Sequence, residues 1–110
     1  MTTEEIVRRA FHAYETANAD ALHALLSDNF KFSAPPEPLL DKDGYMRRCW
    51  PFHAEKPCYQ YEEFFVREQR AVVLYTCTTQ SGKKIRNAEY FHVHDGKLDA
   101  IYVFFGPDIS

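Results

Sequence analysis

The chain has 110 residues, of which 45% are hydrophobic and 15% aromatic, and its formal net charge is −3. This length predicts one domain over residues 1–110, with enough aromatic side chains to line a cavity as well as fill a core. Dispersed basic residues argue against a nucleic-acid-binding surface, and the apolar runs are too short to span a membrane. Three cysteines without C-x-x-C spacing, and no signal-peptide pattern, predict free thiols in the cytoplasm.

The first part of the chain has the apolar spacing of helices. Thr2 or Thr3 can cap a first helix. The apolar arc expected on that helix consists of Ile6, Val7, Ala10, Ala13, Tyr14 and Ala17. Asp20 is expected to cap a short second helix that ends at Asp28-Asn29. The apolar residues of this second helix are Leu22, Leu25 and Leu26.

A short strand and a stiff loop are expected before a third helix. Residues 30–32 alternate in polarity, which predicts the strand, and the prolines at positions 35, 36 and 38 predict a loop that continues neither neighbour. Asp41 or Asp43 can then open a third helix through Trp50. Pro51 is expected to perturb or end that helix, because proline removes a backbone donor.

After Pro57 the sequence period changes to two, which indicates strands. The four predicted strands are Tyr59 to Val66, Ala71 to Thr79, Lys84 to Val93 and Leu98 to Phe105. Short polar connections between them imply an antiparallel meander. Helices first and strands later predict an α+β fold, with about three helices packed on one face of an antiparallel sheet.

The last two strands form a predicted hairpin that contains a carboxyl group among apolar side chains, Glu89. A two-residue Asp95-Gly96 turn would pair Glu89 with Tyr102, whereas a three-residue turn that includes His94 would pair it with Ile101. We expect the longer turn, because it builds one apolar wall. That wall would hold Glu89, Ile101, Val103 and Phe105, and the opposite face would hold Tyr90, His92 and His94.

Two segments resemble the nuclear-transport-factor-2-like superfamily, in its SnoaL-like and ketosteroid-isomerase-like branch. They are N-A-D-A-L-H-A-L-L-S-D-N-F at residues 18–30 and A-E-Y-F-H-V-H-D-G-K-L-D-A-I-Y-V-F-F-G at residues 88–106. The resemblance spans nearly the whole chain. It implies a cone-shaped, strongly curved sheet wrapped around the helices, with an apolar pocket at its open end and no metal or organic cofactor.

The same resemblance suggests catalytic positions. Ketosteroid isomerase uses an Asp base, with a tyrosine and a protonated Asp that bind the oxyanion. Here the base position is Ala34, which argues against steroid isomerisation by that mechanism. The protonated acid is matched by Glu89, and a tyrosine of the first helix is matched in kind by Tyr14. If no basic group reaches Glu89, burial should raise its pKa and make it a hydrogen-bond donor rather than a base.

Structural explanations remain open for each candidate. Glu89 could instead be a carboxyl at the rim, solvated or paired with Arg86, Lys84 or an arginine of the third helix, and Tyr14 could be core packing. The candidate ligand-binding residues, which could equally form a plain core, are Tyr45, Cys49, Trp50, Leu74, Phe91, Ile101, Val103 and Phe105.

The histidines offer weaker candidates. His92 and His94 would share the outer sheet face, but no further ligand is evident, so no metal site is expected. His53 could serve as a base, or pair with Cys49 as a nucleophile, although Pro51 between them disturbs the helical spacing.

The function expected from these features is binding of a small apolar or aromatic molecule, with possible acid–base chemistry by Glu89. The reaction classes consistent with the family resemblance are isomerisation, cyclisation, dehydration and hydrolytic ring opening. The alternative is a non-catalytic ligand carrier or a dimeric interaction module. A homodimer through the outer sheet face is also expected, because alternation along the strands predicts an apolar stripe there, which Tyr90 and Tyr102 could extend. The members of that stripe are Ala71, Val73, Tyr75 and Cys77.

Overall fold

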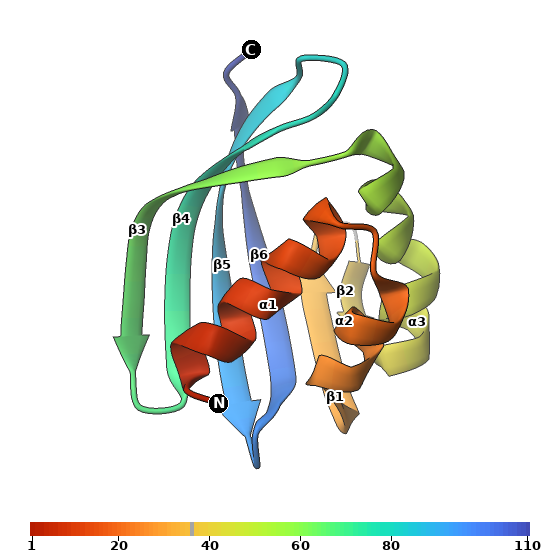
Figure 1. Ribbon diagram of the computed structural model, residues 1–110, viewed down its shortest axis with the longest axis vertical. Helices are drawn as coiled ribbons and strands as arrows, with labels where there is room; N and C mark the ends of the chain where they lie inside the picture. The colour runs from red at the N-terminus through yellow and green to blue at the C-terminus, as the bar shows by residue number, and fades with distance from the viewer. Residues whose placement is uncertain (36) are drawn as a thin grey trace.

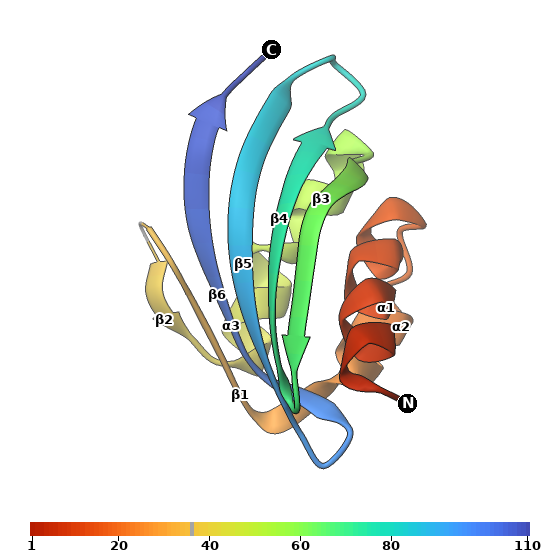
Figure 2. The ribbon, with the colours of Figure 1, turned by 90° about the vertical axis from the view of Figure 1, so that its left-hand side faces the viewer.

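The computed structural model describes residues 1–35 and 37–110; Pro36, which was expected in a loop, lies outside the described residues. A curved sheet wraps around α1, and α2 and α3 lie beside the end of the sheet that β1 and β2 form (Figures 1 and 2). The elements are α1 (Thr3–Glu15), α2 (Ala19–Leu25), β1 (Leu26–Ala34), β2 (Glu37–Leu40), α3 (Lys42–Arg48), the 3₁₀ helix η1 (Trp50–Glu55), β3 (Cys58–Arg67), β4 (Arg70–Thr78), β5 (Lys84–His94) and β6 (Lys97–Asp108).

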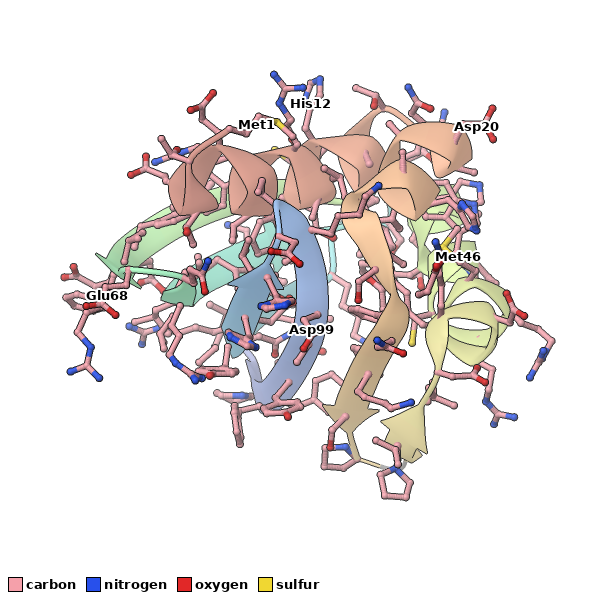
Figure 3. All side chains as sticks on the ribbon, turned by 90° about the horizontal axis from the view of Figure 1, so that it is seen from below. Met1, His12, Asp20, Met46, Glu68 and Asp99 are labelled. Atoms are coloured by element: carbon pink, nitrogen blue, oxygen red, sulfur yellow. The ribbon has the colours of Figure 1, made fainter. Side chains whose placement is uncertain are left out.

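Helix α1 begins at a capping box, in which the Thr2 side chain and the Glu5 side chain each accept a hydrogen bond from the other's backbone amide. Its buried residues are Ile6, Val7, Ala10, Phe11 and Ala13. The expected arc was wrong at two positions: it omitted Phe11, and it included Ala17, which is exposed and has a positive φ of 54° after the helix. His12 projects away from the sheet (Figure 3). No helix in residues 1–35 and 37–110 is long and apolar enough to cross a membrane.

Helix α2 begins and ends earlier than predicted. Its cap is Asn18, whose side chain accepts a hydrogen bond from the Ala21 amide, and not Asp20. The helix ends at Leu25 rather than at Asp28-Asn29. The next residue, Leu26, has extended backbone and begins β1, where it pairs in parallel with Leu98 of β6. Pairing with a strand 72 positions along the chain therefore overrides the local helical pattern.

The segment before α3 contains a short strand, although its prolines predicted a loop. Strand β2 pairs antiparallel with β1, with Leu40 opposite Phe32, and contains Pro38. Because β2 is at the edge of the sheet, Pro38 can be accommodated without breaking a central ladder. Helix α3 is capped by Asp41, whose Oδ1 accepts a hydrogen bond of 2.8 Å from the Gly44 amide. The α-helix ends at Arg48, two residues before the expected end at Trp50, and Pro51 lies in η1.

The four strands predicted after Pro57 are confirmed, with every end within three residues of the one expected. The order in the sheet is β2-β1-β6-β5-β4-β3. Strands β3 to β6 form the expected antiparallel meander, whereas β1 joins β6 in parallel. The sheet therefore has six strands and is mostly, not entirely, antiparallel.

The hairpin turn has two residues rather than three. His94 pairs with Lys97, and Asp95 and Gly96 have φ values of 50° and 75°, which suit a tight hairpin turn. The register then shifts by one residue at Asp99, which forms a bulge in β6. Because the bulge adds one residue to β6, Glu89 shares a face with Val103 and Ile101, as a three-residue turn would also have arranged. Glu89 pairs with Val103, not with Ile101 or Tyr102, yet it shares the predicted face.

The faces of β4 are the reverse of those expected. Val73 pairs with Glu89 and Tyr75 pairs with Asn87, so this set of alternate side chains points toward the helices. The whole set is buried and consists of Ala71, Val73, Tyr75 and Cys77. It therefore does not form the outer stripe. Leu74 lies on the outer face instead, which removes it from any site between sheet and helices.

Candidate functional site

A cavity of about 700 Å³ lies between the concave face of the sheet and the helices. Its aromatic lining consists of Phe11, Tyr14, Phe32, Tyr45, Phe52, Tyr59, Tyr75, Phe91 and Phe105. The exposed residues Glu55, Lys83 and Asp108 also border it. They come from η1, the β4–β5 connection and the end of β6, which lie at the upper end of the molecule in Figure 1. The cavity therefore opens at that end.

Most of the candidate residues from the sequence line this one cavity. They are Glu89, Tyr14, Tyr45, Cys49, Phe91, Ile101, Val103 and Phe105. Trp50 is not among the lining residues; its ring packs 5.0 Å from the ring of Tyr14. Leu74 is on the opposite side of the sheet, as described above. The curvature of the sheet brings the other candidates together from four different elements.

Glu89 is partly buried among the aromatic side chains that line the cavity. Burial raises its pKa to about 7, and a hydrogen bond from the Tyr75 hydroxyl to Oε2 partly opposes that rise. Arg86, considered as a partner from the sequence, pairs with Glu62 at 2.8 Å instead. In the described part of the chain, no basic side chain forms an ion pair with Glu89. Near neutral pH, both its acid and its base forms are therefore populated.

The second oxygen of this carboxyl is accessible. Within residues 1–35 and 37–110, Oε1 makes no hydrogen bond, while every buried side-chain oxygen or nitrogen has a partner. Oε1 is therefore not among the buried atoms, and since Glu89 lines the cavity, a ligand in the cavity can reach it. A carboxyl that can both give and take a proton beside an apolar ligand is suited to acid–base chemistry.

Two polar residues beside Glu89 were not identified from the sequence. Tyr75 lies on β4, and its hydroxyl accepts a hydrogen bond of 3.2 Å from Asn87 Nδ2. Asn87 Oδ1 in turn accepts a hydrogen bond of 3.0 Å from the Gly106 amide. A signal for Asn87 was present, because it stands two residues before Glu89 on the same face of β5. Tyr75 was missed because its strand had been assigned the wrong face.

A second hydrogen-bonding group lies on the helical side of the cavity. The hydroxyl of Tyr14, on α1, donates to the hydroxyl of Tyr45, on α3, at 2.7 Å. Burial is the main cause that raises the pKa of both tyrosines well above the usual value, and Glu89 contributes to both shifts. Both therefore stay protonated at neutral pH. Because Tyr14 donates to Tyr45, the Tyr45 proton is free to be donated to a ligand.

The histidine candidates do not enter the cavity. His53 Nδ1 is 2.7 Å from the Trp50 carbonyl oxygen, and its ring stacks on that of Trp50 with centroids 4.4 Å apart. His92 and His94 each lie near an aspartate, at 3.6 Å from Asp99 and 3.3 Å from Asp95. Across residues 1–35 and 37–110, no three His, Cys, Asp or Glu side chains gather in a group that could hold a metal.

The fold is similar to that of solved NTF2-like structures. One, an NTF2-like protein of unknown function from Cytophaga hutchinsonii, has a TM-score of 0.79 and 25% identity, with 97% of this chain and 92% of that chain covered. A candidate ketosteroid isomerase from Kribbella flavida has a TM-score of 0.80 and 16% identity, covering 98% and 80%. A candidate polyketide cyclase from Sinorhizobium meliloti has 0.77 and 17%, covering 91% and 94%.

The two structures with 16% and 17% identity show a likeness of fold alone. The family model for the SnoaL-like domain matches residues 7–101, and the chain therefore belongs to the SnoaL-like family. A comparison with curated proteins finds no match.

Proposed function

We propose that the protein binds a small, flat and mostly apolar molecule in its cavity and moves a proton on it with Glu89. The observation that carries the proposal is the position of Glu89: a carboxyl with a pKa raised to about 7, whose Oε1 is accessible in an aromatic cavity. The SnoaL-like family and its candidate isomerase and cyclase neighbours agree with this class of chemistry.

The side chains suggest how a proton would be transferred. The reaction we propose is proton transfer at a carbon atom next to a carbonyl group. Glu89 would take the proton through Oε1 and return it, and Tyr45 would donate a hydrogen bond to the oxygen that gains negative charge. In this proposal Glu89 is the base as well as the proton donor. It takes the role of the Asp base of ketosteroid isomerase, whose position is occupied here by Ala34. A pKa near neutrality suits both directions of transfer.

Binding in the cavity can be tested with 2-naphthol, a bicyclic fluorescent phenol. Val103→Phe adds a ring to the cavity wall, so we expect it to weaken 2-naphthol binding by about tenfold or more, equivalent to about 1.4 kcal/mol. Val72→Phe is the matched control, because Val72 is exposed on the outer face. Fluorescence titration measures both affinities, and thermal unfolding confirms that both variants fold. Equal affinities of the two variants would contradict binding in this cavity.

A homodimer through the outer sheet face remains a proposal, with different residues from those expected. Cross-strand pairing places Val72 beside Tyr90 and Tyr90 beside Tyr102, and Leu74 beside Ala88 and Ala88 beside Phe104. Val72, Tyr102 and Phe104 are exposed by 42%, 38% and 63%. A contiguous apolar patch of this kind favours pairing with a second copy by two-fold symmetry.

Light scattering at micromolar concentration tests the dimer. We expect a dimer mass for the unmodified protein and a monomer mass for Phe104→Asp, because a carboxylate in a buried interface is costly. Ile109→Asp is the control, since Ile109 is also exposed but follows the end of β6, away from the paired positions of the patch. A monomer mass for the unmodified protein would remove the proposal.

A further inference from the structure

Glu89 ends a chain of hydrogen bonds that crosses three strands. The Gly106 amide of β6 donates to Asn87 Oδ1, Asn87 Nδ2 donates to the Tyr75 oxygen, and the Tyr75 hydroxyl donates to Glu89 Oε2. Three of these four groups can in principle both donate and accept. The first group in this series of hydrogen bonds, the Gly106 backbone amide, can only donate.

The direction of every bond follows from that first donor. Because the Gly106 amide donates, the atom of Asn87 that faces it must be the amide oxygen, so Nδ2 faces Tyr75. Nδ2 can only donate, so the Tyr75 oxygen accepts, and the single Tyr75 proton is left to point toward Glu89. The chain therefore occupies Oε2 with an incoming proton, and any proton that Glu89 exchanges must use Oε1.

The hydrogen bond from the Gly106 amide to Asn87 depends on an irregularity in the pairing of β5 with β6. The β5–β6 register shifts between Ile85 and Asn87, which pair with Asp108 and Phe105. Two residues of β6 thus oppose one residue of β5 at this bulge. A Cβ atom at position 106 would lie 1.7 Å from the Arg86 carbonyl oxygen, a distance that excludes any side chain there. Glycine therefore allows the close approach that brings the amide to Asn87.

We propose that Asn87, oriented by the Gly106 amide, is a positioning residue that directs the Tyr75 proton to Glu89 Oε2 and leaves Oε1 for the ligand. This inference rests on the proposed function for its role in catalysis. Its structural part, the direction of the Tyr75 proton, can be tested in the free protein without any substrate.

The other titratable or charged groups around Glu89 must be considered before a titration is interpreted. They come from α1, α3 and the residue after it, β3 and β4, and consist of Tyr14, Tyr45, Arg48, Cys49, Tyr59, Tyr61, Tyr75 and Cys77. Burial raises the pKa of each of these tyrosines well above neutrality, and it raises the pKa of Cys77 to about 11. These tyrosines and Cys77 therefore keep their protons while Glu89 titrates.

The test is a double-mutant cycle read by NMR titration of the Glu89 side-chain carboxyl carbon. Tyr75→Phe removes the donor to Oε2, so the Glu89 midpoint should rise by about 0.5 to 1 unit, the scale of one hydrogen bond. Asn87→Leu should raise the midpoint in the same direction, because the Tyr75 hydroxyl is then free to turn. In the Tyr75→Phe background, Asn87→Leu should cause no further rise.

A second variant keeps the test decisive if Asn87→Leu fails to fold. Asn87→Asp has the same shape and still accepts from the Gly106 amide, but its other oxygen accepts the Tyr75 proton and reverses the bond. We expect a larger rise of the Glu89 midpoint than in Asn87→Leu, and a smaller rise when Tyr75→Phe is also present. An Asn87 effect that is equal in both backgrounds, or absent, would overturn the proposal.

Failure of this inference is distinguishable from failure of the proposed function. The titration needs no ligand, so a coupled Asn87–Tyr75 effect would stand even if no proton-transfer activity were found. Conversely, activity that depends on Glu89 but not on Asn87, together with an uncoupled titration, would overturn the positioning role and leave the function intact.

Discussion

Glu89→Gln should abolish most of the protein's ability to exchange the acidic C–H hydrogens of 2-tetralone, a bicyclic ketone, for deuterium in D₂O. The amide has nearly the shape of the carboxyl but cannot take up a proton, so the base is lost while the cavity is retained. Loss of a positioned acid–base group typically costs about 10²–10⁴-fold in rate. Proton NMR follows the loss of the C–H signal directly, with a protein-free sample as the background rate.

The pH dependence of this exchange has a definite sign. The base form of Glu89 removes the C–H proton, and burial raises the pKa of Glu89 to about 7. The protein-dependent rate should therefore be low at pH 5, rise through pH 7 and level off above it. The tyrosine donors remain protonated over this range, because burial raises their pKa values. The rising limb should thus report Glu89 alone.

Glu62→Gln is the matched control, because it makes the same chemical change in a carboxyl that is paired with Arg86 outside the cavity. We expect its exchange rate to equal that of the unmodified protein. Glu89→Gln should still bind 2-naphthol, since an amide can donate a hydrogen bond. If the unmodified protein and Glu89→Gln bind 2-naphthol but exchange 2-tetralone equally slowly, the ligand-carrier alternative replaces the enzyme.

The strands of the second half could be predicted because their signals are local. Alternating residues and a D-G turn set the limits of β5 and β6 within a few positions. The face of Glu89 was predicted correctly for a reason that was partly wrong. The extra residue needed to group Glu89 with Ile101 lies at Asp99 in β6, and not in the turn. A sequence pattern indicates that a register must shift, but not where the bulge forms.

Features that depend on distant pairing were not predicted. Leu26 leaves a helical pattern because it pairs with Leu98, and Pro38 lies in a strand because β2 is at an edge. The faces of β4 could not be decided by alternation, because both faces carry apolar residues: Val73 and Tyr75 on one, Val72 and Leu74 on the other. Only the pairing with β5 shows which set is buried.

The candidate site was predicted in part for the same reasons. Glu89 was predicted because it is a carboxyl among apolar side chains of its own strand. Tyr14 was predicted from the resemblance to ketosteroid isomerase, and Tyr45 as a ligand-binding residue of the third helix. Asn87 and Tyr75 act through contacts between strands and between side chains, which no single-element pattern contains. Phe11 was also missed, although it lies four residues after Val7 and three before Tyr14, at helical spacing.

Phe11→Ala should cause the largest loss of stability among the changes considered. Its ring lies at the centre of the contact between α1 and the sheet, with centroids 4.8, 5.1 and 5.6 Å from those of Tyr59, Tyr75 and Phe91. Truncating a buried phenylalanine to alanine typically costs about 3–5 kcal/mol. Because one side of the Phe11 ring already borders the cavity, we expect a loss near the lower end, about 3 kcal/mol.

Phe65→Ala is the matched control for this loss, because it removes the same atoms from a ring that is 62% exposed on β3. Surface substitutions of this kind usually change the free energy of unfolding by about 0.5 kcal/mol or less. Urea unfolding measures both variants, and unchanged slopes would allow the midpoints to be compared directly. A domain of ordinary stability has only about 5–15 kcal/mol in total, so a loss of 3 kcal/mol would shift the Phe11→Ala midpoint far below that of the control. If the two midpoints coincide, α1 is held on the sheet by contacts other than those of the Phe11 ring.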